Sequence, residues 1–116
     1  MKKKSVGKLG EDLATIYLNR MGYKILARNF RCRAGEVDII AEDVEEIVFI
    51  EVKTRTNNIY GEPSEAVDYI KKEHIIKTAN YYLYINKLYN KSIRFDVIEV
   101  FLSNKFHINH IKQIEL

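Results

Sequence analysis

The residues that could do chemistry lie at the charged ends of two neighbouring apolar segments. The first segment, Gly35–Ile40, contains Asp38, and the second, Ile47–Arg55, contains Glu51 and Lys53. Because side chains alternate along a strand, Glu51 and Lys53 share one face of the second segment. If the charged ends face each other, Asp38, Glu51 and Lys53 meet at one sheet edge beside an apolar floor. Two partly desolvated carboxylates can bind a hard cation through oxygen, with a lysine beside the water that the cation activates.

The same residues also fit an ordinary cross-strand ion pair, in which Lys53 neutralises Asp38 or Glu51. Exposed pairs of this kind are common and contribute about 0–1 kcal/mol. A Glu-x-Lys tripeptide alone is therefore not specific. The combination with Gly-Glu-x-Asp at hairpin distance is more informative, but the residue pattern leaves both interpretations open. Glu36, in the same tetrapeptide, is a weaker candidate for a further ligand.

A helix is predicted over about residues 7–21, ahead of these segments. Its apolar residues recur at helical spacing, and Gly22 is a typical residue for the C-terminal stop. Glu11 then points along a half-buried edge of this helix rather than straight into water, so it is a candidate for a functional site. The alternative is a favourable charge near the helix N-terminus, which stabilises by a few tenths of a kcal/mol.

The other predicted elements give the order α-β-β-β-α-β plus a tail. Strands are expected over residues 23–30, 36–41, 47–54 and 93–102, and the short loop between the second and third predicts a hairpin. Ser64 could cap a helix that runs to about residue 88. The tail from 106 to 116 has isoleucines every three residues, which fits neither the helical period of about 3.6 residues nor the strand period of two. This order predicts an α/β (α+β) protein with helices against one sheet. We expect a single domain over 1–116, with its core at about 7–102 and a tail at 103–116.

Composition excludes several classes of protein. The chain of 116 residues is 47% hydrophobic and 30% charged, which argues against disorder. Its single cysteine, Cys32, forbids an intramolecular disulfide and any zinc site built on clustered cysteines. No apolar run approaches the length that spans a bilayer. We therefore expect a cytoplasmic protein with no membrane association. The net charge of +3 identifies no partner by itself.

Motifs along much of the chain resemble those of the YraN family of small, functionally uncharacterised bacterial proteins. The matching segments, within about residues 7–101, are Gly7–Ala14, Gly22-Tyr23, Arg28–Arg31, Gly35–Ile40, Phe49–Arg55, Glu65–Val67, Lys71-Lys72, Ala79 and Arg94–Val97. The resemblance implies a restriction-endonuclease-like (PD-(D/E)XK) fold, with a mixed sheet flanked by helices. It also implies similarity to archaeal-type Holliday junction resolvases.

The resemblance further implies metal-assisted hydrolysis of DNA phosphodiester bonds. Asp38 matches the motif aspartate, Glu51 and Lys53 match the second carboxylate and the lysine, and Glu11 matches the helical glutamate. Asp38, Glu51 and the backbone carbonyl of Val52 would hold Mg²⁺ or Mn²⁺, and Lys53 would orient the attacking water. Glu11 would bind a second metal ion or orient the water. The sequence departs from the superfamily pattern where Val37, rather than proline, precedes Asp38.

Four arginines could form a basic rim for DNA phosphates, although solvated strand ends explain them nearly as well. They are Arg28, Arg31, Arg33 and Arg55. The DNA could be branched or damaged, and a junction-cutting activity would require two active sites and hence a homodimer. The alternative function is a non-catalytic nucleic-acid-binding module that retains the nuclease fold.

The remaining candidate residues are expected to be structural. His107 and His110 are predicted to lie on the surface, and Asp96 is predicted to be a structural partner for an arginine. Cys32 lacks a neighbouring histidine and is not expected to be a nucleophile. The tyrosines of the second helical region could stack on bases, but their helical spacing predicts that most are packing residues. They are Tyr81, Tyr82, Tyr84 and Tyr89.

Overall fold

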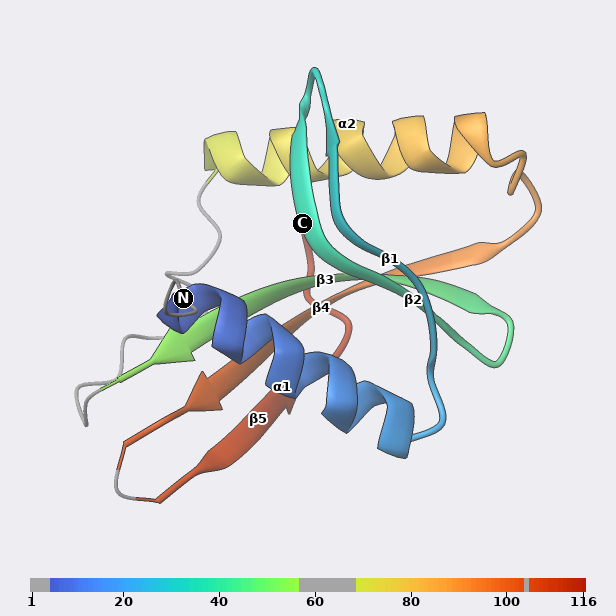
Figure 1. Ribbon diagram of the computed structural model, residues 1–116. Coiled ribbons are helices and arrows are strands. Elements are labelled where there is room, and N and C mark those ends of the chain that lie inside the picture. The colour runs from blue at the N-terminus through green and yellow to red at the C-terminus, as the bar shows by residue number, and fades with distance from the viewer. Residues whose placement is uncertain (1–4, 57–68, 104) are drawn as a thin grey trace.

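The computed structural model describes residues 5–56, 69–103 and 105–116, which form one mixed sheet and two helices (Figure 1). In chain order the elements are α1 (Val6–Arg20), β1 (Lys24–Cys32), β2 (Gly35–Asp43), β3 (Glu46–Arg55), α2 (Tyr69–Ile85), β4 (Ser92–Phe101) and β5 (His107–Ile111). The strand order is β1-β2-β3-β4-β5, with β3 and β4 parallel and the other neighbouring pairs antiparallel. The predicted α+β fold class and element order are confirmed.

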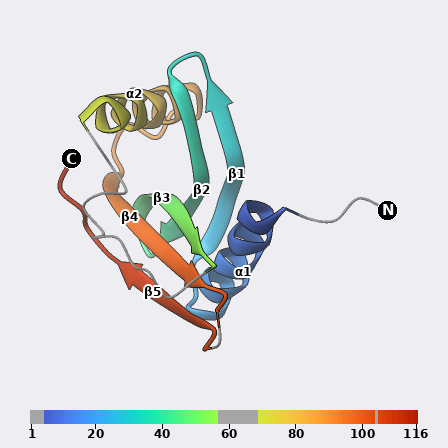
Figure 2. The same ribbon diagram turned by 90° about the vertical axis from the view of Figure 1, so that its left-hand side faces the viewer.

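The two helices lie on opposite faces of the sheet (Figure 2). Ala14 and Leu18 of α1 pack in the same cluster as Val48 and Ile50 of β3. On the other face, α2 packs on Phe49 and its neighbours. Because both faces are covered, the centre of β3 is a continuous apolar run rather than an alternating one.

A glycine sets the close approach of α1 to β3. Gly10 is buried, and a Cβ at this position would come within 3.0 Å of the Thr54 Cβ and closer still to its Oγ1. Only a residue without a side chain therefore lets α1 lie against the end of β3. Glu11, the next residue, is consequently held next to the charged end of that strand.

The predicted hairpin of β2 and β3 is confirmed, and its two strands separate at Asp38. Their ladder runs from the Asp43–Glu46 pair to the Ile39–Ile50 pair. Beyond Ile39, β2 continues paired with β1 as far as the Cys32–Gly35 pair. Both views show the β1–β2 hairpin curving away from β3 toward α2 (Figures 1 and 2). We call this point of separation the fork.

Helix α2 lies within the segment predicted to be helical, and the predicted cap at Ser64 lies outside the described residues. Its buried stripe includes Ile75, Ala79 and Tyr82, at helical spacing. The prediction that most of its tyrosines are packing residues is wrong. Only Tyr82 of the four is buried, whereas the exposed fractions are 47% for Tyr81, 68% for Tyr84 and 66% for Tyr89. Successive helical residues are turned by about 100°, so Tyr82 faces the sheet whereas Tyr81 and Tyr84 face outward, and Tyr89 lies in the turn beyond the end of α2.

The tail that fitted neither period supplies the edge strand β5. Ile108 packs in the cluster of α1, whereas Ile111 and Ile114 pack in a separate cluster with Ile75 and Val97. The three isoleucines therefore do not lie on one face, which explains why their spacing is not that of an amphipathic element. After β5 the chain turns, and the Ile114 N–H donates to the Phe95 carbonyl at 2.7 Å. In the described parts of the chain, neither helix has the length and apolar character needed to cross a membrane.

Candidate functional site

Asp38 lies at the fork, where β2 leaves β3. Its Oδ2 accepts a hydrogen bond from the Val52 N–H at 2.8 Å. Continuing the ladder past the Ile39–Ile50 pair would place Val52 opposite Val37 of β2, but the strands have already separated there. The Asp38 carboxylate thus binds β3 where the ladder ends. This contact fixes Asp38 beside residues 51–53 of β3.

Glu51 is held by two lysines, one of which was not among the predicted site residues. Lys53 Nζ lies 3.6 Å from Glu51 Oε1, and Lys71 Nζ from α2 donates a hydrogen bond to the same oxygen. Asp38, Glu51 and Lys53 are therefore brought together as the sequence predicted. Lys71 was missed because its placement depends on how α2 lies over the sheet. The Lys71-Lys72 pair among the family motifs was the only signal for it.

The electrostatics of the fork show a crowded set of carboxylates. Burial raises the pKa of Asp38 to about 7, and the neighbouring Glu51, Glu11 and Glu36 carboxylates add to this effect. Burial also lowers the pKa of Lys53, as does the ammonium of Lys71 beside it. For Lys71, burial opposes the charged form, but the hydrogen bond to Glu51, the contact with Lys53 and the charges of Glu51 and Asp38 together outweigh it and raise the pKa.

Glu11 is half-buried next to this group rather than exposed at a helix end. It is the sixth residue of α1, and the first turn of that helix contains no acidic residue. The alternative of a helix N-terminal charge is therefore wrong. Among the described residues, its buried Oε1 has no hydrogen-bond partner, and Arg28 Nη2 lies 3.8 Å away. A buried carboxylate oxygen without a donor is costly unless a charge compensates it.

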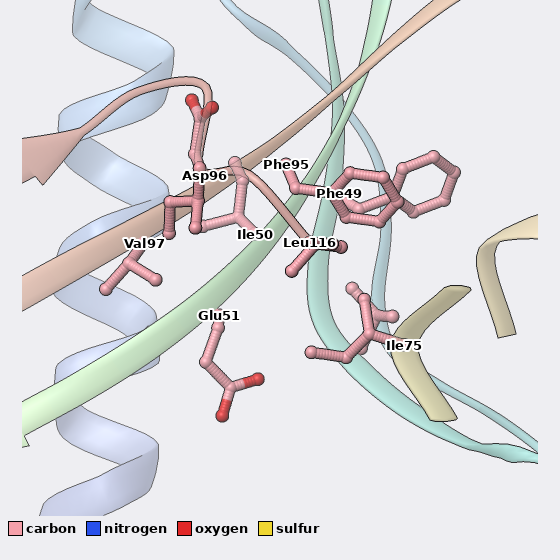
Figure 3. A pocket seen from close by; sticks show the side chains of 10 residues that line it. Phe49, Ile50, Glu51, Ile75, Phe95, Asp96, Val97 and Leu116 are labelled. Carbon is pink, nitrogen blue, oxygen red and sulfur yellow. The ribbon is translucent and has the colours of Figure 1, made fainter. Parts of the chain in front are cut away.

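An apolar floor lies behind Glu51. Glu51 lines a small cavity together with Phe49, Phe95, Ile75 and Leu116, among others (Figure 3). The cavity volume is about 20 Å³, and a site of that size holds about one water molecule. It is therefore part of the packed core and not a substrate pocket. Its apolar lining lowers the local dielectric around the Glu51 carboxylate.

The oxygen donors at the fork fit a hard divalent cation. Over the described residues, no three His, Cys, Asp or Glu side chains form a metal-binding group. Asp38 and Glu51 nonetheless provide two carboxylates, and Mg²⁺ is commonly bound through one or two carboxylates while it keeps several waters. Glu11 Oε1 accepts no hydrogen bond from the described residues, and burial together with the neighbouring carboxylates raises the pKa of Asp38, so a bound cation would stabilise both groups in their ionised form.

The four arginines predicted to face phosphates separate into two groups. Arg28 pairs with Asp12 at 2.7 Å, and Arg55 pairs with Glu99 at 3.3 Å, both half-buried. Arg31 and Arg33, at the end of the β1–β2 hairpin, are exposed. Arg31 also pairs with Glu36 at 2.7 Å, so Glu36 is exposed and already has a cationic partner, although its charge still acts on Asp38. Only the two hairpin arginines are therefore well placed for an external ligand.

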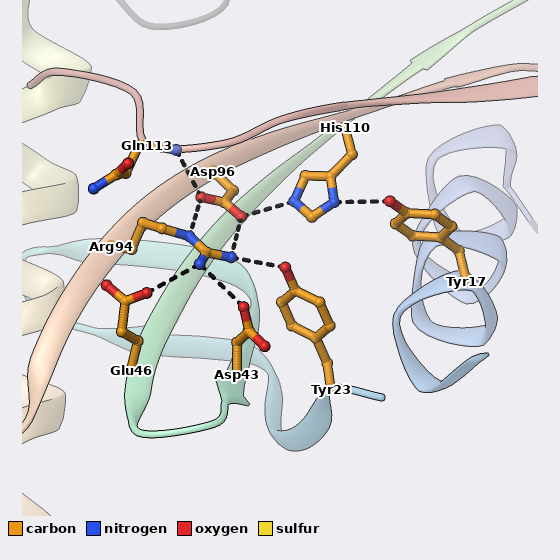
Figure 4. Close-up of polar contacts among 8 residues, drawn as sticks. All are labelled: Tyr17, Tyr23, Asp43, Glu46, Arg94, Asp96, His110 and Gln113. Atoms are coloured by element: carbon orange, nitrogen blue, oxygen red, sulfur yellow. Dashed lines mark hydrogen bonds and ion pairs between the residues drawn. The ribbon is translucent and has the colours of Figure 1, made fainter. Parts of the chain in front are cut away.

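A second polar cluster is structural, as predicted for Asp96. The Arg94 guanidinium donates to both oxygens of Asp96 at 2.9 and 3.0 Å, and to Asp43, Glu46 and Tyr23 (Figure 4). These acceptors raise the pKa of Arg94 despite its burial. For Asp96, burial opposes ionisation, but its hydrogen bonds from His110 and Arg94 outweigh it and lower the pKa.

His110 belongs to this cluster, so its predicted surface position is wrong. Its side chain is 6% exposed and bonds Asp96 at 2.7 Å through Nε2 and the Tyr17 hydroxyl at 2.9 Å through Nδ1. The reason is that β5, which the sequence did not predict, carries His110 between β4 and α1. His107 is exposed as predicted and stacks on Phe101.

The fold and the fork define a small α+β protein with a carboxylate–lysine site at a strand junction. Residues 10–100 match the profile of the uncharacterised protein family UPF0102. Among similar UPF0102 proteins, that of Clostridium kluyveri is 48% identical over 112 residues, which is 97% of this chain and 92% of the relative. That of Clostridium perfringens strain 13 is 51% identical over 117 residues, covering 97% and 96% of the two chains. The chain therefore belongs to family UPF0102, and the predicted YraN-type resemblance is confirmed.

One similar solved structure is that of an "EndoMS-dsDNA2 complex". A chain in it aligns with a TM-score of 0.41 and 20% identity, covering 82% of this chain and 36% of that chain. This chain thus spans about a third of the length of that protein.

Proposed function

We propose that this protein is a metal-dependent endonuclease that hydrolyses DNA phosphodiester bonds. The observation that supports it is the fork, where the end of the β2–β3 ladder brings Asp38, Glu51 and Lys53 together, with the half-buried Glu11 adjacent. Two carboxylates can hold the cation that metal-assisted phosphodiester hydrolysis uses, and the neighbouring ammonium adds positive charge beside it.

Asp38 and Glu51, with the backbone carbonyl of Val52, are the residues that would hold Mg²⁺ or Mn²⁺. When bound, such a cation lowers the pKa of its water and offsets charge on the phosphoryl oxygens. The raised pKa of Asp38 makes this binding pH-dependent, because a ligand carboxylate must be ionised. We expect metal affinity to rise as the pH passes through about 7.

The lysines and Glu11 position the reactants. Lys53 Nζ is half-buried with a lowered pKa, so it can orient a water molecule or donate to a phosphate oxygen without strong hydration of its own. Lys71 fixes Glu51 by a hydrogen bond to Oε1. Glu11, whose Oε1 accepts no hydrogen bond from the described residues, can hold a second cation or orient water.

The proposed substrate is DNA, and the two exposed arginines of the β1–β2 hairpin are the proposed phosphate contacts. Branched DNA is one candidate form. Because cleavage of a junction requires two cuts, that substrate would require a homodimer, whereas a nick in linear DNA would not.

A non-catalytic DNA-binding module is the second candidate function. The observation that favours it is Lys71, whose ammonium already neutralises Glu51 where a cation would be needed. In such a module the fork is a structural ion-pair cluster, and the basic hairpin alone contacts DNA.

A cleavage assay distinguishes the two functions. The purified protein is incubated with linear duplex, single-stranded and four-way-junction DNA, with Mg²⁺, with Mn²⁺ or with EDTA. A nuclease cuts at least one substrate only with metal, and Asp38→Ala and Lys53→Ala abolish cutting, while the exposed-site control Lys105→Ala does not. Cleavage that survives both site substitutions indicates a contaminating enzyme. Binding without metal-dependent cleavage favours the module.

A further inference from the structure

We propose that a basic cleft beside α2 binds single-stranded DNA that leads into the fork. The cleft lies between the turn of the β1–β2 hairpin and the exposed face of α2, and has a volume of about 410 Å³. We call it the hairpin–helix cleft; its lining residues are Arg31, Cys32, Arg33, Ala34, Lys77 and Tyr81. The inference rests on the proposed function and adds to it a binding surface and a form of DNA.

The cleft is held in shape by contacts between the hairpin turn and α2. His74 Nδ1 donates to the Ala34 carbonyl at 2.6 Å, and Cys32 Sγ lies 3.8 Å from Thr78 Oγ1. Gly35 has φ +153°, and a Cβ there would lie 3.2 Å from Thr78 Oγ1 and 3.3 Å from His74 Cβ. The turn is therefore fixed to the helix, and a ligand need not order the cleft on binding.

Every charged side chain that lines the cleft within the described residues is positive. Arg31, Arg33 and Lys77 are all exposed, and they come from both walls. Glu36 pairs with Arg31 but does not line the cleft. Guanidinium groups bind phosphate through paired N–H donors, and a lysine adds a compact charge. The cleft is therefore suited to the phosphates of a nucleic-acid strand.

Tyr81 supplies an aromatic surface in the same cleft. Its side chain is 47% exposed, and its ring lies 6.3 Å from that of Phe30 at an interplanar angle of 33°. The ring is thus supported on one side and accessible on the other. Basic side chains combined with an accessible aromatic ring are the pattern of single-strand binding, in which bases stack on the ring. The bases of a duplex already stack on each other and offer no free face.

The cleft and the fork both contact α2. Lys71 of this helix bonds Glu51 at the fork, and Lys77 lines the cleft further along the helix. Lys71 and Lys77 are six residues apart, which corresponds to about 9 Å along the helix axis. Six residues also turn the side chain by about 120° around the helix, so a strand from the cleft must follow the surface of α2 partly around the helix to reach the fork. The cleft and the fork are within two helical turns of each other along α2, so one strand can occupy both.

The test is a binding measurement in EDTA, so that no cleavage occurs. A short fluorescently labelled single-stranded oligonucleotide and its blunt duplex are titrated, and fluorescence anisotropy gives each Kd. Tyr81→Ala is expected to weaken single-strand binding about tenfold and duplex binding less than twofold, and Tyr81→Phe to leave both unchanged. Lys77→Ala is expected to weaken both and to lower the slope of log K against log salt by about 1. The exposed control Lys105→Ala, in the β4–β5 connection away from α2, should bind as the wild type does (Figures 1 and 2).

The inference is overturned if Tyr81→Ala and Lys77→Ala bind the single strand as tightly as the wild type, or if the wild type does not bind it. Because both side chains are exposed, these variants should fold, and far-UV circular dichroism verifies this. The proposed nuclease activity is judged separately. A wild type that binds through the cleft but cuts no DNA with Mn²⁺ supports this inference and contradicts the nuclease. Metal-dependent cleavage by the wild type, with unchanged single-strand affinity in both cleft variants, supports the nuclease and contradicts this inference.

Discussion

Asp38→Asn should stabilise the metal-free protein. A carboxyl group whose pKa is higher in the folded than in the unfolded state stabilises the fold only while it is protonated. The pKa of Asp38 rises from 3.8 to about 7 on folding, so the wild type loses stability as the pH rises between these values. The full shift corresponds to about 4 kcal/mol at pH 8. Partial exposure and screening reduce this, and we expect the variant to gain about 2 kcal/mol.

The asparagine keeps the local structure, because its side-chain oxygen can still accept from the Val52 N–H. Urea unfolding in EDTA, followed by circular dichroism at several values between pH 5 and pH 8, gives the free energy of unfolding. The gain should be largest at pH 8 and should shrink as the pH falls toward 5. Glu45→Gln, in the exposed turn of the β2–β3 hairpin, should show no comparable pH-dependent gain.

Two results would refute this reasoning. One is an Asp38→Asn variant less stable than the wild type at pH 8, which would mean that the carboxylate stabilises the fork. The other is a gain that does not change with pH. Mg²⁺ should raise the free energy of unfolding of the wild type at pH 8 more than that of the variant. A cation that binds only the folded state stabilises it, and the variant lacks the Asp38 carboxylate that would bind the cation.

Three further substitutions test how the site is positioned. Gly10→Ala should lower the free energy of unfolding by about 1–3 kcal/mol, because the added Cβ overlaps Thr54. The control Gly7→Ala has open space around it and should cost nothing. Equal effects of the two substitutions in urea unfolding would contradict this. Arg94→Met should cost about 3–5 kcal/mol by leaving a buried carboxylate unpaired, and a loss below about 1 kcal/mol would show that the cluster is not structural. Lys71→Ala should raise the affinity for Mn²⁺, measured by titration calorimetry, because a competing ammonium is removed; weaker binding would show that Lys71 supports the metal site.

The local parts of this site could be predicted from the sequence. Helical spacing predicted α1, and the short loop between two apolar segments predicted the hairpin that brings Asp38 near Glu51 and Lys53. These relations depend on neighbours in the chain and on strand periodicity, which a sequence shows directly.

The rest depends on how distant elements pack. Lys71 reaches Glu51 only because α2 lies over the sheet at one particular register, and no periodicity in the helix specifies that. The separation of β2 from β3 after Ile39 arises from the bend of the hairpin toward α2. Strand β5 was missed because its isoleucines pack in different clusters, and with it the burial of His110.

The central claim is that the fork is a metal-dependent active site, and the most direct measurement is the DNA cleavage rate as a function of Mn²⁺ concentration. The wild type, Glu51→Gln and the turn variant Glu45→Gln are compared at one pH, after each is shown to be folded. The account predicts a saturable rise in rate for the wild type and Glu45→Gln, and no rise above the EDTA level for Glu51→Gln. Equal Mn²⁺ dependence in all three proteins, or no cleavage by the wild type at any Mn²⁺ concentration, would contradict it.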